Sequence, residues 1–140
     1  MFYVLLGLII FCIFMSLRTL FQPYKIKGKI VSIENFLFLG TIYVTVMIGF
    51  ALLYSLLHLN GHPVLGETGT VRPASDFIET IESSVYFSAM TLFSVGHGDI
   101  VPLGVGRAIA ILEALIGYTI PAAFVAKAVS NMENKPPAVK

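Results

Sequence analysis

Three long apolar stretches constrain the fold of this chain more than any other feature of its sequence. They run from about residue 1 to 21, 36 to 59 and 105 to 129, and the second contains no Asp, Glu, Lys or Arg. A helix needs about 20 apolar residues to cross the hydrocarbon core of a bilayer, where a helix also satisfies its own backbone hydrogen bonds. The pattern therefore predicts an all-α membrane protein with three membrane helices.

The composition argues against a soluble protein. Of the 140 residues, 56% are hydrophobic and only 12% are charged, about half the charged share of a soluble domain. The first stretch is not typical of a signal peptide, which needs a positive start and a small-residue cleavage site. Its first charge is Arg18, at its far end. We therefore expect this helix to remain uncleaved.

Several functional classes find no support in the sequence. The net charge is +1 and the basic residues form no patch, so no nucleic-acid partner is expected. No nucleophile–base pair, phosphate-cradling loop or redox motif is present, so neither an enzyme nor an organic cofactor is indicated.

The positions of Lys and Arg predict the orientation in the membrane. Of nine such residues, only Arg72 and Arg107 lie between the end of the second apolar stretch and the first turn of the third. The others flank the opposite ends of the stretches, and Lys and Arg accumulate on the cytoplasmic side of membrane proteins. We expect the amino terminus outside, a cytoplasmic loop at 22–35 and a cytoplasmic tail at 130–140.

The segment between the second and third stretches does not fit a simple hairpin. Residues 60–75 are rich in turn formers and predict an irregular turret, whereas 76–93 begin with acidic residues that favour a helix amino terminus. This helix is too short to span a bilayer, and it ends at Gly96-His97-Gly98. Glycines permit backbone conformations that other residues resist. A re-entrant loop is predicted, which survives at membrane depth only where protein covers it or water bathes it.

Thr91-Leu92-Phe93-Ser94-Val95-Gly96-His97-Gly98-Asp99 resembles the pore signature of the potassium channel superfamily, T-x-x-T-V-G-Y-G-D. The resemblance covers about residues 37–129 and is closest to small prokaryotic two-helix channels. It implies an outer helix at 36–59, a pore helix at 76–93, a filter at 94–99 and an inner helix at 105–129. It also implies a bacterial plasma membrane.

The resemblance further implies a homotetramer that conducts potassium ions. Filter carbonyl oxygens of this family replace the hydration shell of the ion. Here these would be the carbonyls of Ser94, Val95, Gly96 and His97, with the Ser94 hydroxyl at the innermost site. The Val95 side chain would point away from the axis, and Gly96 and Gly98 would let the carbonyls face one way. Four chains are needed to surround each ion.

Two residues depart from the family signature. His97 replaces tyrosine, and histidine changes charge near neutral pH, so we expect outside acidification to reduce current. A neutral ring packed against its neighbours is the alternative. Phe93 replaces a small polar residue, and its ring would either narrow the cavity below the filter or pack sideways.

Three residues are candidates for supporting the filter. Met90 stands where some family members carry a bracing carboxylate, so Asp99 needs another partner, for which Tyr86 is the candidate. An ionisable group inside a membrane helix is costly and is usually paired or functional. Glu113 is such a group, and we expect it to face Ser84 or Ser88 of the pore helix as a brace.

Gly117 and Pro121 lie four residues apart in the third stretch. Gly117 stands where the family has a hinge glycine, and proline removes one helix hydrogen bond. A gate hinge and a static kink are both compatible with this spacing.

Two rivals to a potassium channel remain open at this stage. One is a nonselective cation channel of the same architecture, because His97 and Phe93 depart from the signature. The other is a nonconducting membrane scaffold that retains the pore fold.

Overall fold

The computed structural model describes residues 1–21, 33–67 and 77–133, which form four helices and two short strands. The expected loop at 22–35 and the expected tail lie mostly outside the described residues, as does part of the turret. The helices are α1 (Phe2–Phe21), α2 (Ile33–Leu59), α3 (Phe77–Leu92) and α4 (Val105–Glu133), and the strands are β1 (Leu65–Glu67) and β2 (Ile100–Pro102).

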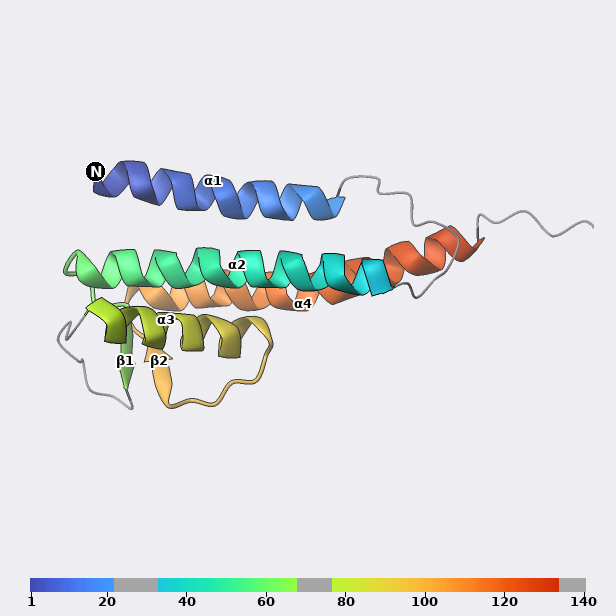
Figure 1. Ribbon diagram of the computed structural model, residues 1–140. Coiled ribbons are helices and arrows are strands. Elements are labelled where there is room, and N and C mark those ends of the chain that lie inside the picture. Colours follow the sequence, from blue (N-terminus) through green and yellow to red (C-terminus); the bar gives the residue numbers. More distant parts are fainter. Residues whose placement is uncertain (22–32, 68–76, 134–140) are drawn as a thin grey trace, which may run out of the picture.

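The long helices α2 and α4 lie side by side and antiparallel (Figure 1). Among the described residues, Phe36–Leu59 and Val105–Ala126 are long and apolar enough to cross a membrane. Only 28% and 17% of these windows are buried inside the chain. Core helices of a soluble protein would be mostly covered, so this exposed apolar surface indicates membrane helices.

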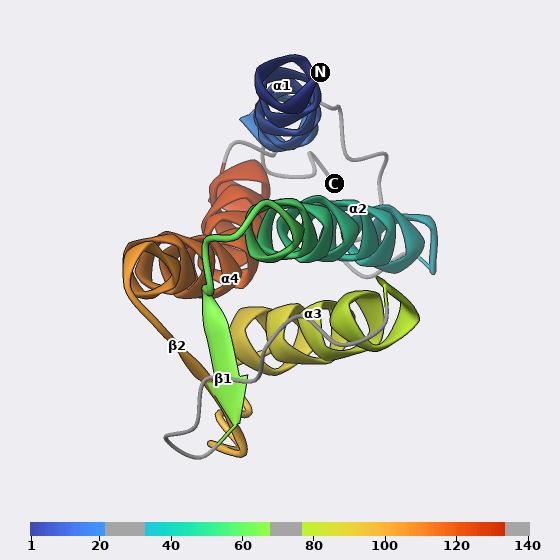
Figure 2. The same ribbon diagram turned by 90° about the vertical axis from the view of Figure 1, so that its left-hand side faces the viewer.

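The helix α1 packs on the side of α2 that faces away from α3 (Figure 2). Its apolar part, Phe2–Arg18, is shorter than the two spans above. Ile13 is its buried contact residue, and it lies against Gly49 of α2. The third membrane crossing expected from the sequence stays a prediction.

The short helix α3 begins at the same end of the molecule as the carboxyl end of α2 and the amino end of α4 (Figure 1). It ends well before the other end of those helices, and the chain after it returns to the starting end. One face of α3 is buried through Thr80, Ser84, Phe87, Ser88 and Leu92. This is the geometry of a re-entrant segment.

A two-stranded sheet joins the entry and exit of this segment, which corrects the expectation of an all-α chain. β1 and β2 pair antiparallel, with Gly66 opposite Val101. The Leu103 N–H donates to the Val64 carbonyl at 2.8 Å and extends the pairing by one step. Strands of three residues leave too little periodicity to be predicted from sequence.

The helix α4 bends in its carboxyl-terminal part, drawn in red (Figure 2). Pro121 lies inside α4, and proline is one of the few established causes of a sharp bend in a long helix. Its buried face is a stripe at helical spacing: Gly106, Ala110, Glu113, Gly117 and Ile120.

Candidate functional site: the re-entrant segment and its supports

The helix α3 ends in a Schellman motif, in which hydrogen bonds cap its last carbonyls. The Ser94 N–H donates to the Thr91 carbonyl at 3.1 Å, and the Val95 N–H donates to the Met90 carbonyl at 2.9 Å. Ser94 adopts a φ of 57°, the left-handed conformation that this motif requires. This cap ends α3 at the start of the signature.

The sign of φ alternates along the signature. It is positive at Ser94, Gly96 (61°) and Gly98 (79°). Ser94 is the only non-glycine residue with positive φ in the described parts of the chain, so Val95 and His97 have negative φ. When φ alternates in sign, successive peptide planes are rotated in opposite directions. This rotation allows the carbonyl oxygens of consecutive residues to face the same side of the chain. Glycine adopts the left-handed conformation without strain.

In the single chain this segment is exposed. All residues from Phe93 to Asp99 are classed as exposed, including Val95 at 55%. The side chain of Val95 therefore has no packing partner within one chain that would hide it. Non-helical backbone at membrane depth needs cover from protein or water.

The Phe93 ring packs sideways. It stacks on Tyr43 of α2, with ring centroids 5.3 Å apart and an angle of 12° between the planes. Phe93 is still 52% exposed. Within the single chain the ring thus takes the sideways orientation of the two that the sequence left open.

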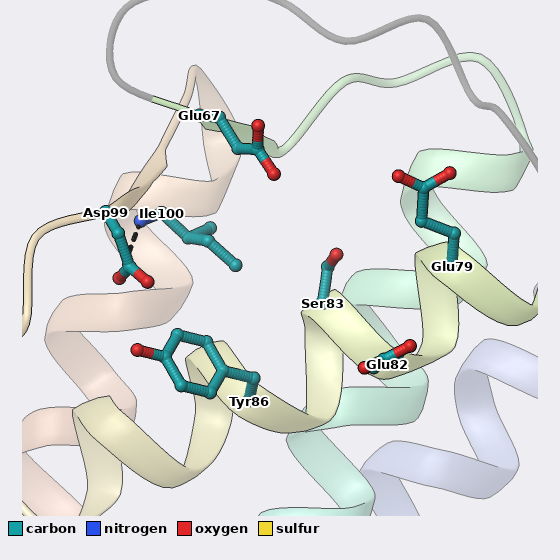
Figure 3. A pocket seen from close by; sticks show the side chains of 7 residues that line it. All are labelled: Glu67, Glu79, Glu82, Ser83, Tyr86, Asp99 and Ile100. Carbon is teal, nitrogen blue, oxygen red and sulfur yellow. Dashed lines mark hydrogen bonds between the residues drawn. The ribbon is translucent and has the colours of Figure 1, made fainter.

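Asp99 is bonded to the backbone that follows it and lies near Tyr86 of α3. Its Oδ1 accepts a hydrogen bond from the Ile100 N–H at 3.0 Å, and the Tyr86 ring of α3 lies opposite (Figure 3). The Tyr86 hydroxyl is the largest cause that lowers the pKa of the Asp99 carboxyl, and His97 contributes through its charge. The nearby Asp99 carboxylate in turn raises the pKa of Tyr86. Tyr86 and Asp99, which the sequence suggested as partners, therefore line the same hollow, and their hydrogen bond stays a prediction.

These two residues belong to a hollow of about 560 Å³ beside the returning segment. It is lined by Glu67, Glu79, Glu82, Ser83, Tyr86, Asp99 and Ile100 (Figure 3). Four of these seven side chains are carboxylates. The hollow therefore concentrates negative charge at the end of the molecule where the re-entrant segment enters and exits.

Glu113 of α4 is fully buried and joins three helices. It accepts a hydrogen bond from the Tyr54 hydroxyl of α2 at 2.9 Å through Oε2, and its Oε1 is paired with Ser88 of α3. Of the two serines suggested by the sequence, Ser88 is the partner. The Ser84 hydroxyl is also buried, but among the described residues it has no hydrogen-bond partner.

The Ser88 hydroxyl has two potential acceptors and only one proton. Ser88 Oγ lies 3.0 Å from the Met47 carbonyl and is also bonded to Glu113 Oε1. A serine hydroxyl has one proton, and a carbonyl can only accept. If Ser88 donates to Met47, Glu113 must donate to Ser88 and is then a neutral carboxylic acid. Such a group avoids the cost of an unpaired charge in the membrane.

Gly117 lets α4 approach the end of α3. A Cβ atom at this position would lie 2.2 Å from the Leu92 carbonyl oxygen. Any side chain would therefore collide with backbone at the base of the signature. This close contact is a reason for glycine here that sequence analysis did not anticipate.

Two further residues were missed from sequence, Tyr43 and Tyr54. Both lie in the uniformly apolar α2, where each hydroxyl needs a partner in place of water. The sequence therefore indicates that the two tyrosine hydroxyls have hydrogen-bond partners, but it does not identify these partners.

The geometry defines an integral membrane protein with a re-entrant helix–strand segment between two membrane helices. The chain belongs to an ion channel family, described as "Ion channel", whose pattern matches residues 36–134. It is thus an ion channel and not an enzyme. Protein LctB of Bacillus caldotenax is 38% identical over 134 residues, covering 95% of this chain and 98% of LctB. Protein LctB of Geobacillus stearothermophilus is 36% identical over 133 residues, with the same coverage. No solved structure matches the chain.

Proposed function

We propose that four copies of this chain form a potassium-selective pore, in which the segment from Ser94 to Gly98 is the filter. The alternating φ from Ser94 to Gly98 is the observation that carries the proposal. Carbonyls of Ser94, Val95, Gly96 and His97 replace the hydration shell of each potassium ion, and the Ser94 hydroxyl closes the innermost site.

The need for several copies follows from exposure and from coordination chemistry. One chain leaves the whole segment from Phe93 to Asp99 open, and one strand offers too few oxygens to offset the dehydration of a cation. Four copies around an axis supply a full cage. The exposed apolar surface of α2 and α4 then faces neighbouring copies and lipid.

The supports of the filter follow from the contacts described above. Tyr86 holds Asp99 at the outer mouth, and Glu113 ties the pore helix α3 to α2 and α4. The acidic hollow adds a negative field that raises the local cation concentration. The proposed orientation has the amino terminus and this mouth outside, and the carboxyl terminus in the cytoplasm of a bacterium. Gly117 and Pro121 form the bend at which the inner helix moves.

Flux from liposomes tests the proposal. The purified protein is reconstituted in potassium-loaded vesicles, and reversal potentials are then measured in mixed potassium and sodium. We expect potassium efflux and a reversal potential that follows the potassium gradient. A reversal potential near zero would establish a nonselective channel. Absence of any ion flux would establish a nonconducting scaffold.

The matched variants are Gly96→Ala and Gly7→Ala. Alanine at Gly96 has to adopt a φ of 61°, which costs about 1 kcal/mol per chain. We expect this variant to lose selectivity or current. Gly7 lies in α1, where an added Cβ meets nothing within 4 Å, and its variant should conduct like the unmodified chain.

A further inference from the structure

The bend in α4 leaves one backbone carbonyl without its helical partner. In an α-helix the N–H of residue i donates to the carbonyl of residue i−4. Residue 121 is proline, which has no N–H, so the Gly117 carbonyl lacks the i+4 hydrogen bond that any other residue at 121 would donate. Inside a bilayer such a group must find another donor.

That donor comes from a different helix. The Tyr43 hydroxyl of α2 donates to the Gly117 carbonyl at 2.8 Å, across 74 positions of sequence. Tyr43 thus supplies from α2 the hydrogen bond that Pro121 removes from α4.

The same tyrosine also contacts the base of the filter. Its ring stacks on Phe93, which directly precedes Ser94. Gly117 in turn lies against the carbonyl of Leu92, the last residue of α3. One side chain therefore touches both the bend of α4 and the residue that leads into the filter.

We infer that Tyr43 is a positioning residue that couples the bend of α4 at Gly117–Pro121 to the base of the filter. A change in the bend moves the Gly117 carbonyl and pulls on the Tyr43 hydroxyl. The stacked ring transmits this movement to Phe93 and so to Ser94. The inference deepens the proposed function and rests on it for its effect on ion flow.

The test is a double-mutant cycle of Tyr43→Phe and Pro121→Ala. Phenylalanine keeps the stacked ring and removes the hydroxyl. Alanine at position 121 restores the N–H that pairs with the Gly117 carbonyl, so the tyrosine bond is no longer needed. We expect Tyr43→Phe to change the closed–open equilibrium constant by roughly three- to tenfold per subunit, the worth of one hydrogen bond. In the Pro121→Ala background the same change should be below about twofold.

Two further readouts separate coupling from a general loss of structure. Single-channel conductance and the reversal potential should be unchanged in Tyr43→Phe, because the filter backbone keeps its contacts. Thr45→Val is the control, since the Thr45 hydroxyl on the same helix bonds to the Thr41 carbonyl of that helix, at 2.8 Å. It should gate normally.

The double-mutant cycle can also be measured without ion flow, from the midpoint of thermal unfolding of each variant in detergent. Tyr43→Phe should lower the midpoint in the original background and leave it unchanged with Pro121→Ala. Equal effects of Tyr43→Phe in the two backgrounds, on unfolding or on gating, would overturn the inference. If the unmodified protein passes no ions, the proposed function fails, and the coupling to ion flow fails with it. The unfolding cycle then still decides whether Tyr43 replaces the missing N–H.

Discussion

The helix α1 and the unit formed by α2, α3 and α4 are held by different forces. The contact of α1 that is buried is apolar, with Ile13 against Gly49. The α2–α4 unit instead contains interhelical hydrogen bonds from Tyr43, Tyr54 and Ser88. The family pattern begins at residue 36 and so covers the second unit alone.

The difference matters because lipid changes the balance of forces. Lipid tails are as apolar as leucine, so apolar contact between helices gains little over contact with lipid. Hydrogen bonds and close approach at small residues then select which helices pack and how. The comparison indicates that hydrogen bonds and close contacts hold α2, α3 and α4 in one relative orientation, whereas α1 is attached more weakly.

The largest effect is expected at Glu113, which bonds to both α2 and α3. Glu113→Ala removes both bonds, leaves the Tyr54 hydroxyl unpaired and opens a cavity. We expect the free energy of unfolding to fall by roughly 2–4 kcal/mol per chain, measured by unfolding in detergent.

The control for this prediction is Glu113→Gln, which is uncharged and both donates and accepts. If Glu113 is a neutral acid that donates to Ser88, glutamine should cost less than half as much as alanine. A carboxylic acid band in the infrared spectrum that is lost in Glu113→Gln would support this protonation. Equal losses for the two variants would contradict it.

A smaller effect is expected at Gly117. An added Cβ would lie 2.2 Å from the Leu92 carbonyl oxygen, and backbone at a helix end cannot move aside as a flexible side chain can. Gly117→Ala should therefore cost about 1–3 kcal/mol of stability, as overpacked cores do. Thermal unfolding measures this loss.

Gly40→Ala is the matched control on α2, where an added Cβ meets nothing within 4 Å. Since alanine favours helix over glycine, its stability should be unchanged or slightly increased. A Gly117→Ala variant as stable as Gly40→Ala would show that α4 does not pack tightly on the end of α3.

The sequence predicted those features that depend on local pattern. Apolar length predicted α2 and α4, and the glycines at 96 and 98 predicted the turn after a short helix. The location of a potential brace at Glu113 followed from the cost of an ionisable group in a membrane helix.

The remaining features depend on contacts between distant residues. The pairing of β1 with β2 joins Leu65 to Pro102, and strands this short have no readable period. The bond from Tyr43 to Gly117 depends on how α2 and α4 are aligned along their axes. Nothing in either helix alone specifies that alignment, because it depends on which residues of the two helices meet.

A change in current with pH is the next effect in size. We expect lowering the outside pH from 8 to 5 to reduce potassium current at least about twofold, because protonated His97 rings repel cations at the mouth. Tyr86 lowers the pKa of Asp99. A carboxyl with a lowered pKa loses its charge only as pH falls below the ordinary range of aspartate, near 4. Asp99 therefore stays ionised across this interval and does not cause the change.

Currents of His97→Tyr should be insensitive to pH over this range. His62→Asn is the matched control, since His62 is also exposed and follows the carboxyl end of α2, and its variant should keep the full sensitivity. Sensitivity that persists in His97→Tyr would assign the titration to another group.

The smallest effect is expected at the contact of α1 with α2. An added Cβ at Gly49 would lie 2.6 Å from Cγ1 of Ile13, which is a side-chain atom on a helix held by apolar contact. Because α1 can shift in lipid, Gly49→Ala should cost less than about 1 kcal/mol, and flux and reversal potential should be unchanged. Ile13→Ala in the Gly49→Ala background should restore the original spacing of the two helices, measured as the distance between spin labels on α1 and α2. A loss of stability as large as that of Gly117→Ala would mean that α1 is as firmly packed as the pore unit, and the comparison would fail.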